Sequence, residues 1–181
     1  MRVVSGKYRG LNLAEFNAEN IRPTADRVKE SLFNILSSKV AGAQVLDLFR
    51  GSGNLGIECL SRGARQVFFN DISKQSLQVL NKNLSRLKGG EKYTVNNCDY
   101  LSFLNSTAEK FDIIFLDPPY AMEISGTALL KIAERDLLND GGVVVYERDL
   151  PFSGETPLEV YDTRKYGRVH LTFFRKKGDA K

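Results

Sequence analysis

From residue 45 onward, short apolar runs alternate with amphipathic stretches along the chain. The apolar runs have the length of strands, and the stretches between them repeat apolar residues at helical spacing, as Leu77, Leu80, Leu84 and Leu87 do. The predicted strands are residues 45–49, 66–70, 93–97, 111–116 and 143–148. Helices are expected to end near residue 62, to span about 73–88 and 124–138, and to include a short one after residue 99. Strands that alternate with helices in this way predict βαβ units and a parallel sheet.

The two ends of the chain depart from this alternation. Residues 1–21 combine short apolar pieces with glycines and predict a hairpin or extended arm, and residues 22–40 repeat apolar positions on one helical face. Near the C-terminus, the runs 157–163 and 168–175 flank Gly167 and predict an antiparallel pair. We therefore expect a single domain over residues 1–181 with its core in 43–175. Its fold class is α/β, a doubly wound, mostly parallel seven-stranded sheet with an antiparallel C-terminal edge and a short N-terminal extension.

Composition narrows the class of protein. The chain has 181 residues, of which 42% are hydrophobic and 27% charged, which is ordinary for a globular protein with a proper core. Neither a membrane-spanning run nor the apolar core of a signal peptide occurs, so we expect a cytoplasmic protein without a membrane partner. With a single histidine and two cysteines outside metal-ligand spacing, no metal site is expected.

The net charge of +4 and a pI near 9.0 favour a polyanionic partner. Basic residues gather at the two ends of the chain, whereas the middle is nearly balanced. Solvated surface charge is the simpler interpretation for each one. The candidates for contact with a nucleic acid are Arg2, Lys7, Arg9, Arg22, Arg27, Lys29 and Arg168.

A glycine-rich loop follows the first predicted strand of the core. Gly51, Gly53 and Gly56 allow a tight turn and the close approach of a ligand to backbone N–H groups at a helix N-terminus. Asp71 lies twenty positions after Gly51, at the end of the next strand, where an acid can bind both hydroxyls of a ribose. These features alone suit a nicotinamide cofactor equally well.

Two further acids favour S-adenosylmethionine over a nicotinamide. The anionic side chain of Asp47, just before the glycines, would repel a pyrophosphate but could bind an ammonium group directly or through water. Asp99 ends the third strand and could accept a hydrogen bond from an adenine amino group. S-adenosylmethionine carries an ammonium, a ribose diol and an adenine amine. Helix capping is the alternative interpretation of each acid taken singly.

The four residues Asp117, Pro118, Pro119 and Tyr120 follow the strand at 111–116. Two prolines stiffen a loop and remove two N–H donors. A carboxylate, a proline carbonyl and an aromatic face can together accept both hydrogens of a planar amino group and stack on the ring that carries it. The loop is therefore a candidate site for the exocyclic amine of a base, although a simple capping loop has the same composition.

At this point the chain resembles a family. The glycine loop and the Asp-Pro-Pro-Tyr motif are the pattern of class I amino-methyltransferases that act on nucleic-acid bases. Residues 2–10, 22–36 and 47–56 are more specific, and together they resemble bacterial 16S ribosomal RNA guanine-N2 methyltransferases of the RsmD type. The resemblance runs from residue 2 to about 167. Arg50 and Asn54 depart from the small residues usual there, which bears on donor affinity, and Asp71 is often glutamate in relatives.

The resemblance implies a Rossmann-like methyltransferase fold, S-adenosylmethionine as donor, S-adenosylhomocysteine as product, and 16S rRNA as substrate, within a wholly or partly assembled small subunit. A monomer is expected. The implied catalytic residues are Asp117, Pro118 and Tyr120. The expected cofactor-binding residues are Asp47, Phe49, Gly51, Gly53, Asn54, Gly56, Asp71, Ile72, Asp99 and Tyr100. Arg27 or Thr24 could instead bind the donor carboxylate.

Three alternatives remain open from the residues. The four-residue motif does not distinguish guanine N2 from adenine N6, or RNA from DNA. A nicotinamide-dependent oxidoreductase would use the same glycines. A non-catalytic RNA-binding module would result if Arg50 prevented donor binding.

Overall fold

The computed structural model describes residues 1–15, 23–49, 51–118 and 125–179, with side chains for all of these except 23–25 and 125. Its strands are β1 Gln44–Asp47, β2 Gln66–Asn70, β3 Tyr93–Asn96, β4 Phe111–Leu116, β5 Leu138–Arg148, β6 Glu159–Tyr166 and β7 Val169–Arg175. Its helices are α1 Pro23–Ile35, α2 Ser37–Val40, α3 Asn54–Ser61, α4 Lys74–Leu84, α5 Tyr100–Ser106 and α6 Ser125–Glu134. No helix among these residues has both the length and the apolar content needed to cross a bilayer.

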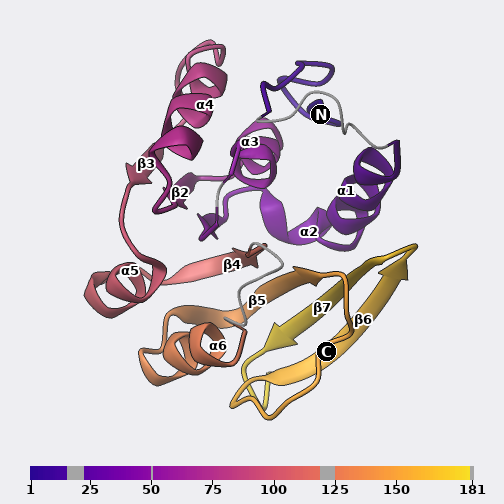
Figure 1. Cartoon of the computed structure of the whole chain (residues 1–181), viewed down its shortest axis with the longest axis vertical. Helices are drawn as coiled ribbons and strands as arrows, with labels where there is room; N and C mark the ends of the chain where they lie inside the picture. The colour runs from indigo at the N-terminus through magenta and orange to yellow at the C-terminus, as the bar shows by residue number, and fades with distance from the viewer. Residues whose placement is uncertain (16–22, 50, 119–124, 180–181) are drawn as a thin grey trace.

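The strands form one sheet in the order β3-β2-β1-β4-β5-β7-β6 (Figure 1). The first five are parallel to one another, whereas β7 runs antiparallel to both β5 and β6. The predicted seven-stranded, mostly parallel sheet with an antiparallel C-terminal edge is therefore confirmed.

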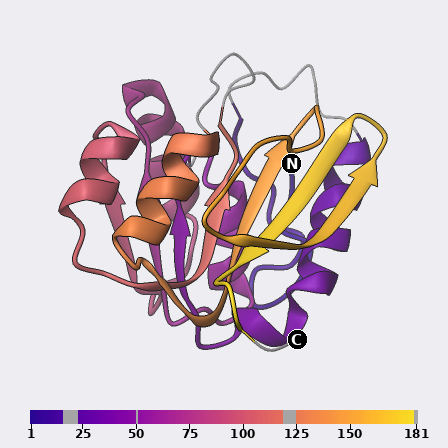
Figure 2. The ribbon, with the colours of Figure 1, turned by 90° about the horizontal axis from the view of Figure 1, so that it is seen from below.

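Helices cover both faces of the sheet (Figures 1 and 2). Successive strand residues point to opposite faces, so Val45 packs in the core beneath α1, α3 and α4, while Leu46 packs in the core beneath α5 and α6. Because both faces are buried at the centre of the sheet, β4 is apolar at every position except Asp112.

The N-terminal arm is a short hairpin that packs on α3. An isolated antiparallel bridge joins Arg2 to Asn12, and the arm buries Val3, Tyr8 and Leu13 in the core. The backbone N–H of residue 7 donates to the Ser61 carbonyl at the end of α3. The arm is therefore part of the folded domain.

The single helix predicted over residues 22–40 is wrong in its extent. The chain forms α1 and a separate one-turn helix, α2, with Leu36 between them in a non-helical conformation. The side chain of Leu36 is fully buried, as is that of Val40. A turn at Leu36 lets both residues reach the core.

The carboxyl ends of β1 to β5 lie along one edge of the sheet, and the amino ends of the same strands lie along the opposite edge. β1 lies between β2 and β4, so the chain reverses direction across the sheet at this point. Open α/β sheets bind ligands in the crevice at such a switch point. The loops after β1, β2, β3 and β4 all converge there.

Candidate active site

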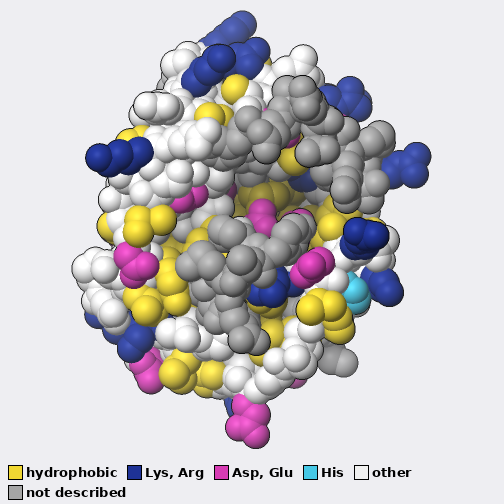
Figure 3. Space-filling model, in the orientation of Figure 1, with side chains coloured by type: hydrophobic (Ala, Val, Ile, Leu, Met, Phe, Trp, Pro, Cys, Tyr) yellow, Lys and Arg dark blue, Asp and Glu magenta, His cyan; other side chains and the backbone are white. Residues whose placement is uncertain are grey.

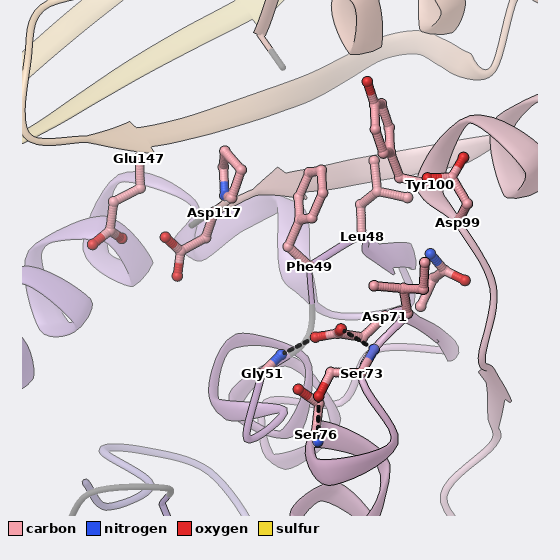
Figure 4. Close-up of a pocket in the computed structure, with 13 residues that line it drawn as sticks. Leu48, Phe49, Gly51, Asp71, Ser73, Ser76, Asp99, Tyr100, Asp117 and Glu147 are labelled. Atoms are coloured by element: carbon pink, nitrogen blue, oxygen red, sulfur yellow. Dashed lines mark hydrogen bonds between the residues drawn. The ribbon is translucent and has the colours of Figure 1, made fainter. Parts of the chain in front are cut away.

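A pocket with a volume of about 570 Å³ occupies the carboxyl ends of the parallel strands. Figure 3 shows a hollow at the centre of one face with acidic and apolar side chains in and around it, while most of the Lys and Arg side chains lie toward the periphery. The pocket is lined by Leu48, Phe49, Gly51, Asn70, Asp71, Ile72, Ser73, Ser76, Asp99, Tyr100, Asp117, Pro118 and Glu147 (Figure 4). Carboxylates thus line an otherwise largely apolar cavity.

The glycines of the loop after β1 have separate roles. Gly51 has a φ of +47° and open space where a side chain would stand, so its backbone can approach a ligand. A Cβ on Gly53 would lie 2.2 Å from Leu80, and one on Gly56 would lie 2.2 Å from the Phe69 ring. Gly51 therefore lines the pocket, whereas Gly53 and Gly56 permit close packing of α3 behind it.

Asp71 follows β2 directly and is held by the backbone. One carboxylate oxygen accepts from the Gly51 N–H at 3.1 Å and the other from the Ser73 N–H at 2.8 Å (Figure 4). Each carboxylate oxygen has a second acceptor position. The carboxylate is therefore oriented and can still accept from a pair of ribose hydroxyls.

Asp99 caps α5 and also lines the pocket. One of its oxygens accepts from the N–H groups of Leu101 and Ser102. Close by, the rings of Phe49 and Tyr100 pack with centroids 5.4 Å apart. The capping interpretation is thus correct for Asp99, but it leaves acceptor capacity beside an aromatic wall that suits a planar base.

Asp117 follows β4 directly, and its carboxylate points into the pocket beside that of Glu147 (Figure 4). Asp117 is exposed, and the space it faces is the pocket. Withdrawal from bulk water raises the pKa of Asp117 to about 6. Burial, and then the charge of Asp117, raise the pKa of Glu147 to about 8.

Four residues predicted to bind the cofactor lie outside the pocket lining. Asp47 is buried and accepts from the Gly56 N–H at 3.0 Å, which fixes the start of α3 to the end of β1. The amide oxygen of Asn54 accepts from the ammonium of Lys29 at 2.8 Å. Gly53, Asn54, Gly56 and Asp47 are all absent from the pocket lining. Phe49, Gly51, Asp71, Ile72, Asp99 and Tyr100 do line it, and their contact with the cofactor stays a prediction.

Lys29 does not fit the predicted contact with RNA. Its side chain is buried, and its ammonium lies 3.3 Å from Glu58 and donates to the Arg2 carbonyl. Burial lowers the pKa of Lys29, and Glu58 opposes this effect. Lys29 therefore joins the arm to α1 and α3. In the sequence, Lys29 lies on the polar face of a predicted helix, and nothing in that position indicates a buried ion pair.

Exposed basic residues remain at the surface. Arg2, Arg9, Arg27 and Arg168 are exposed. Lys7 is also exposed, but its ammonium pairs with Glu91 at 2.6 Å. Glu91 comes just before β3, so this pair lies at the amino ends of the strands, opposite the pocket. Arg168 lies in the β6–β7 turn, next to the carboxyl end of β5. Predicted positions outside the described residues are Arg22, Arg50, Pro119, Tyr120 and the side chain of Thr24.

Sequence reasoning missed five residues that line the pocket. Leu48, Asn70, Ser73 and Ser76 adjoin the predicted ones and complete the wall around Asp71. Glu147 lies one residue inside β5, and the recurrence of acids at strand ends could have indicated it. Among the residues described, no group of three or more His, Cys, Asp or Glu could hold a metal ion.

The strand order and the pocket at the switch point place this chain among the S-adenosylmethionine-dependent methyltransferases. More narrowly, it belongs to the family described as conserved hypothetical protein 95, whose model matches residues 1–175 and whose curated relatives include ribosomal RNA small subunit methyltransferase D.

Two relatives show how far the similarity extends. The chain is 38% identical over 152 residues to ribosomal RNA small subunit methyltransferase D of Haemophilus influenzae, covering 82% of this chain and 79% of the relative. The protein of the same name from Escherichia coli is 35% identical over 150 residues, covering 83% and 75%. Among solved structures, yhhF from Escherichia coli, which carries a provisional methyltransferase name, has a TM-score of 0.84 and 29% identity, with 97% of each chain covered.

Proposed function

We propose that this protein transfers a methyl group from S-adenosylmethionine to the exocyclic N2 amine of a guanine in 16S ribosomal RNA. The observation that carries this proposal is the Asp117 carboxylate, which enters the same pocket as Asp71 and Asp99. The names of the relatives support ribosomal RNA of the small subunit as the substrate.

The residues around Asp71 fit the methyl donor. Asp71 accepts from the ribose hydroxyls, Asp99 accepts from the adenine amine, and Phe49, Ile72 and Tyr100 supply apolar walls for the adenine. The Gly51 backbone leaves space for close approach. When bound, the donor supplies an electrophilic methyl group on a positively charged sulfur. Asp47 contributes by holding the loop in place rather than by direct contact.

Asp117 and the Pro118 carbonyl act on the acceptor amine. The lone pair of guanine N2 is delocalised into the ring, which makes the nitrogen a poor nucleophile. Hydrogen bonds accepted by Asp117 and the Pro118 carbonyl favour a pyramidal nitrogen and aim its lone pair at the methyl group. Catalysis is then mostly positioning, because the nitrogen becomes strongly acidic only after methylation and then releases its proton to the Asp117 carboxylate. Stacking of Tyr120 on the base stays a prediction.

The target guanine must be unpaired or extruded, since a base inside a duplex cannot enter a pocket between strand ends. Arg2, Arg27 and Arg168 are candidates for phosphate contacts around the pocket. A domain of this size has little surface with which to select one guanine in a long RNA. We therefore include a partly assembled small subunit in the proposal as the substrate.

The test is transfer of labelled methyl from S-adenosylmethionine to small ribosomal subunits that lack the modification. Digestion to nucleosides and chromatography then identify the product. Label in N2-methylguanosine is the expected result. Label in N6-methyladenosine would keep the chemistry and replace the substrate, and absence of label from subunits, naked rRNA and DNA, with donor binding intact, would contradict the proposal.

A further inference from the structure

Glu147 lies beside Asp117 on the neighbouring strand. Leu116 of β4 pairs with Tyr146 of β5, so Asp117 and Glu147 hold the next matching positions of two parallel strands. Such strands are about 4.8 Å apart. Phe115 and Val145, two residues earlier, pack in the same core, so the alternation places both carboxylates on the same face of the sheet.

The two carboxylates form an open pair of acceptors. Within the part of the chain that the structure describes, neither makes a hydrogen bond or an ion pair, and Figure 4 shows both reaching into the same end of the pocket. Asp71 and Asp99, in contrast, are each held by two backbone N–H groups. Glu147 is partly buried without a donor among the described residues, which is costly, and Asp117 stands open beside it, so the pair favours a ligand that brings two donors to this position.

We propose that Glu147 determines the specificity of the enzyme for guanine by accepting the N1–H of the base while Asp117 accepts from the N2 amine. This inference rests on the proposed function, because it concerns the base that the same pocket receives. It gives a role to a residue that the Asp-Pro-Pro-Tyr motif does not include.

The hydrogen-bonding edges of the bases explain the selection. Guanine presents N1–H next to the N2 amine, which are two donors side by side and match two acceptors. Adenine presents its N6 amine next to a bare N1, so an ionised Glu147 would face a lone pair. A site built to pair with a donor rejects the analogue that lacks it, because the acceptor is left unpaired. A matched carboxylate contact is expected to contribute about ten- to hundredfold in selectivity.

The elevated pKa of Glu147 agrees with this role. Burial and the neighbouring charge of Asp117 raise this pKa, because both make the ionised form of Glu147 less stable. The N1–H and N2–H donors of guanine offset both effects. The donors stabilise the ionised form of the pair when the base enters.

The experiment uses the base analogue 2,6-diaminopurine, which keeps the N2 amine but has no N1–H. The methylated position is first mapped from the wild-type product. An RNA with guanosine or 2,6-diaminopurine at that position is then assembled into small subunits, and kcat/KM is measured for both above pH 8, where Glu147 is ionised and cannot donate to the bare N1. Wild-type protein should favour guanosine by about ten- to hundredfold. Glu147→Gln should lose most of this preference, because the amide can donate to the bare N1 as well as accept from N1–H.

Controls separate this role from a structural one. Glu147→Asp keeps the carboxylate and should keep the preference, even at a lower rate. Asp149→Asn removes an exposed acid just outside the pocket lining and should match wild type. Donor binding by calorimetry checks that each variant is folded.

Two outcomes would overturn the inference. One is a wild-type protein that methylates both bases equally well; the other is a Glu147→Gln variant that loses activity on both bases by the same factor and keeps its preference. If Glu147→Gln does not fold, a loss of preference in Glu147→Asp would also overturn it. Absence of N2-methylguanosine from the wild-type reaction would instead contradict the proposed function, so the two failures are distinguishable.

Discussion

At the scale of single residues, the acids of the pocket are distinguished by what holds them. Asp71 is fixed by backbone N–H groups on both of its oxygens, so it offers an oriented acceptor before any ligand arrives. Among the described residues, Asp117 has no such hydrogen bonds, and it stands in the cavity with a raised pKa. A fixed acid suits recognition of the donor, and an open one suits the acceptor amine, whose hydrogens change direction during transfer.

This difference predicts opposite effects for two substitutions. Asp117→Ala should leave donor affinity nearly unchanged and lower single-turnover methylation by about 10²–10³-fold, the range for loss of one polar group that acts on the transition state. Asp71→Ala should weaken donor binding by about ten- to hundredfold through loss of charge-assisted hydrogen bonds. Calorimetry with the donor and single-turnover assays at saturating donor measure the two effects. Equal loss of both quantities in Asp117→Ala would contradict its assignment to the acceptor.

The same residues predict a dependence of activity on pH. Only an ionised carboxylate accepts a hydrogen bond on all its oxygen positions, and the pKa values are raised to about 6 for Asp117 and about 8 for Glu147. Because both shifts are upward, kcat/KM should rise with pH across this window and level off above it. Glu147→Gln should remove the upper part of the rise. A profile that is flat from pH 6 to 8.5 in the wild type would show that neither ionisation controls the reaction.

At the scale of elements, Glu58 in α3 joins three segments of the chain. It accepts from the N–H groups of Val4 and Ser5 in the arm, from Arg62 one turn later, and pairs with Lys29 of α1. Its side chain is completely buried. One carboxylate therefore links the arm and α1 to α3, in addition to their apolar contacts.

Loss of this carboxylate should destabilise the fold strongly. Glu58→Ala leaves a buried ammonium and two backbone donors with fewer partners, and we expect the free energy of unfolding to fall by about 3–5 kcal/mol. Urea unfolding followed by circular dichroism measures the change. The control is Lys110→Ala, which breaks an exposed pair with Asp136 and should cost less than about 1 kcal/mol. A change in Glu58→Ala no larger than that of the control would show that the arm is held by its apolar contacts alone.

Elements with a clear period were predictable, and tertiary packing decided the rest. The apolar runs at 66–70 and 111–116 became β2 and β4 with the predicted bounds. The strand predicted from residue 143 instead begins at Leu138. Gly141 and Gly142 resemble the end of a helix in the sequence, but in the structure they lie within β5. The acids at strand ends indicated most of the pocket, since strand ends of a parallel sheet meet at one edge. The burial of Lys29 was not predictable, because its partner Glu58 lies on another helix with no local pattern linking the two.

At the scale of the whole molecule, three exposed basic candidates for RNA contact lie at different edges of the sheet, two at the carboxyl ends of the parallel strands and one at their amino ends. Arg168 lies at the edge that holds the pocket. Arg27 lies near the start of α1, two residues before Lys29, and Lys29 contacts the first residue of α3. Arg27 therefore lies on the same side as the pocket. Lys7 is held by Glu91 at the opposite edge. An RNA that places a base in the pocket would therefore follow the first edge.

This division predicts which charges contribute to RNA binding. Arg27→Ala and Arg168→Ala should each weaken binding to small-subunit RNA and reduce the slope of log affinity against log salt by about one, while donor affinity stays unchanged. Lys7→Ala is the matched control, since it also removes one exposed positive charge and should leave the slope as in the wild type. Filter binding between low and moderate salt measures the slopes. Equal effects of all three substitutions would place RNA on both edges of the sheet, and an effect of Lys7→Ala alone would move the binding surface to the edge opposite the pocket.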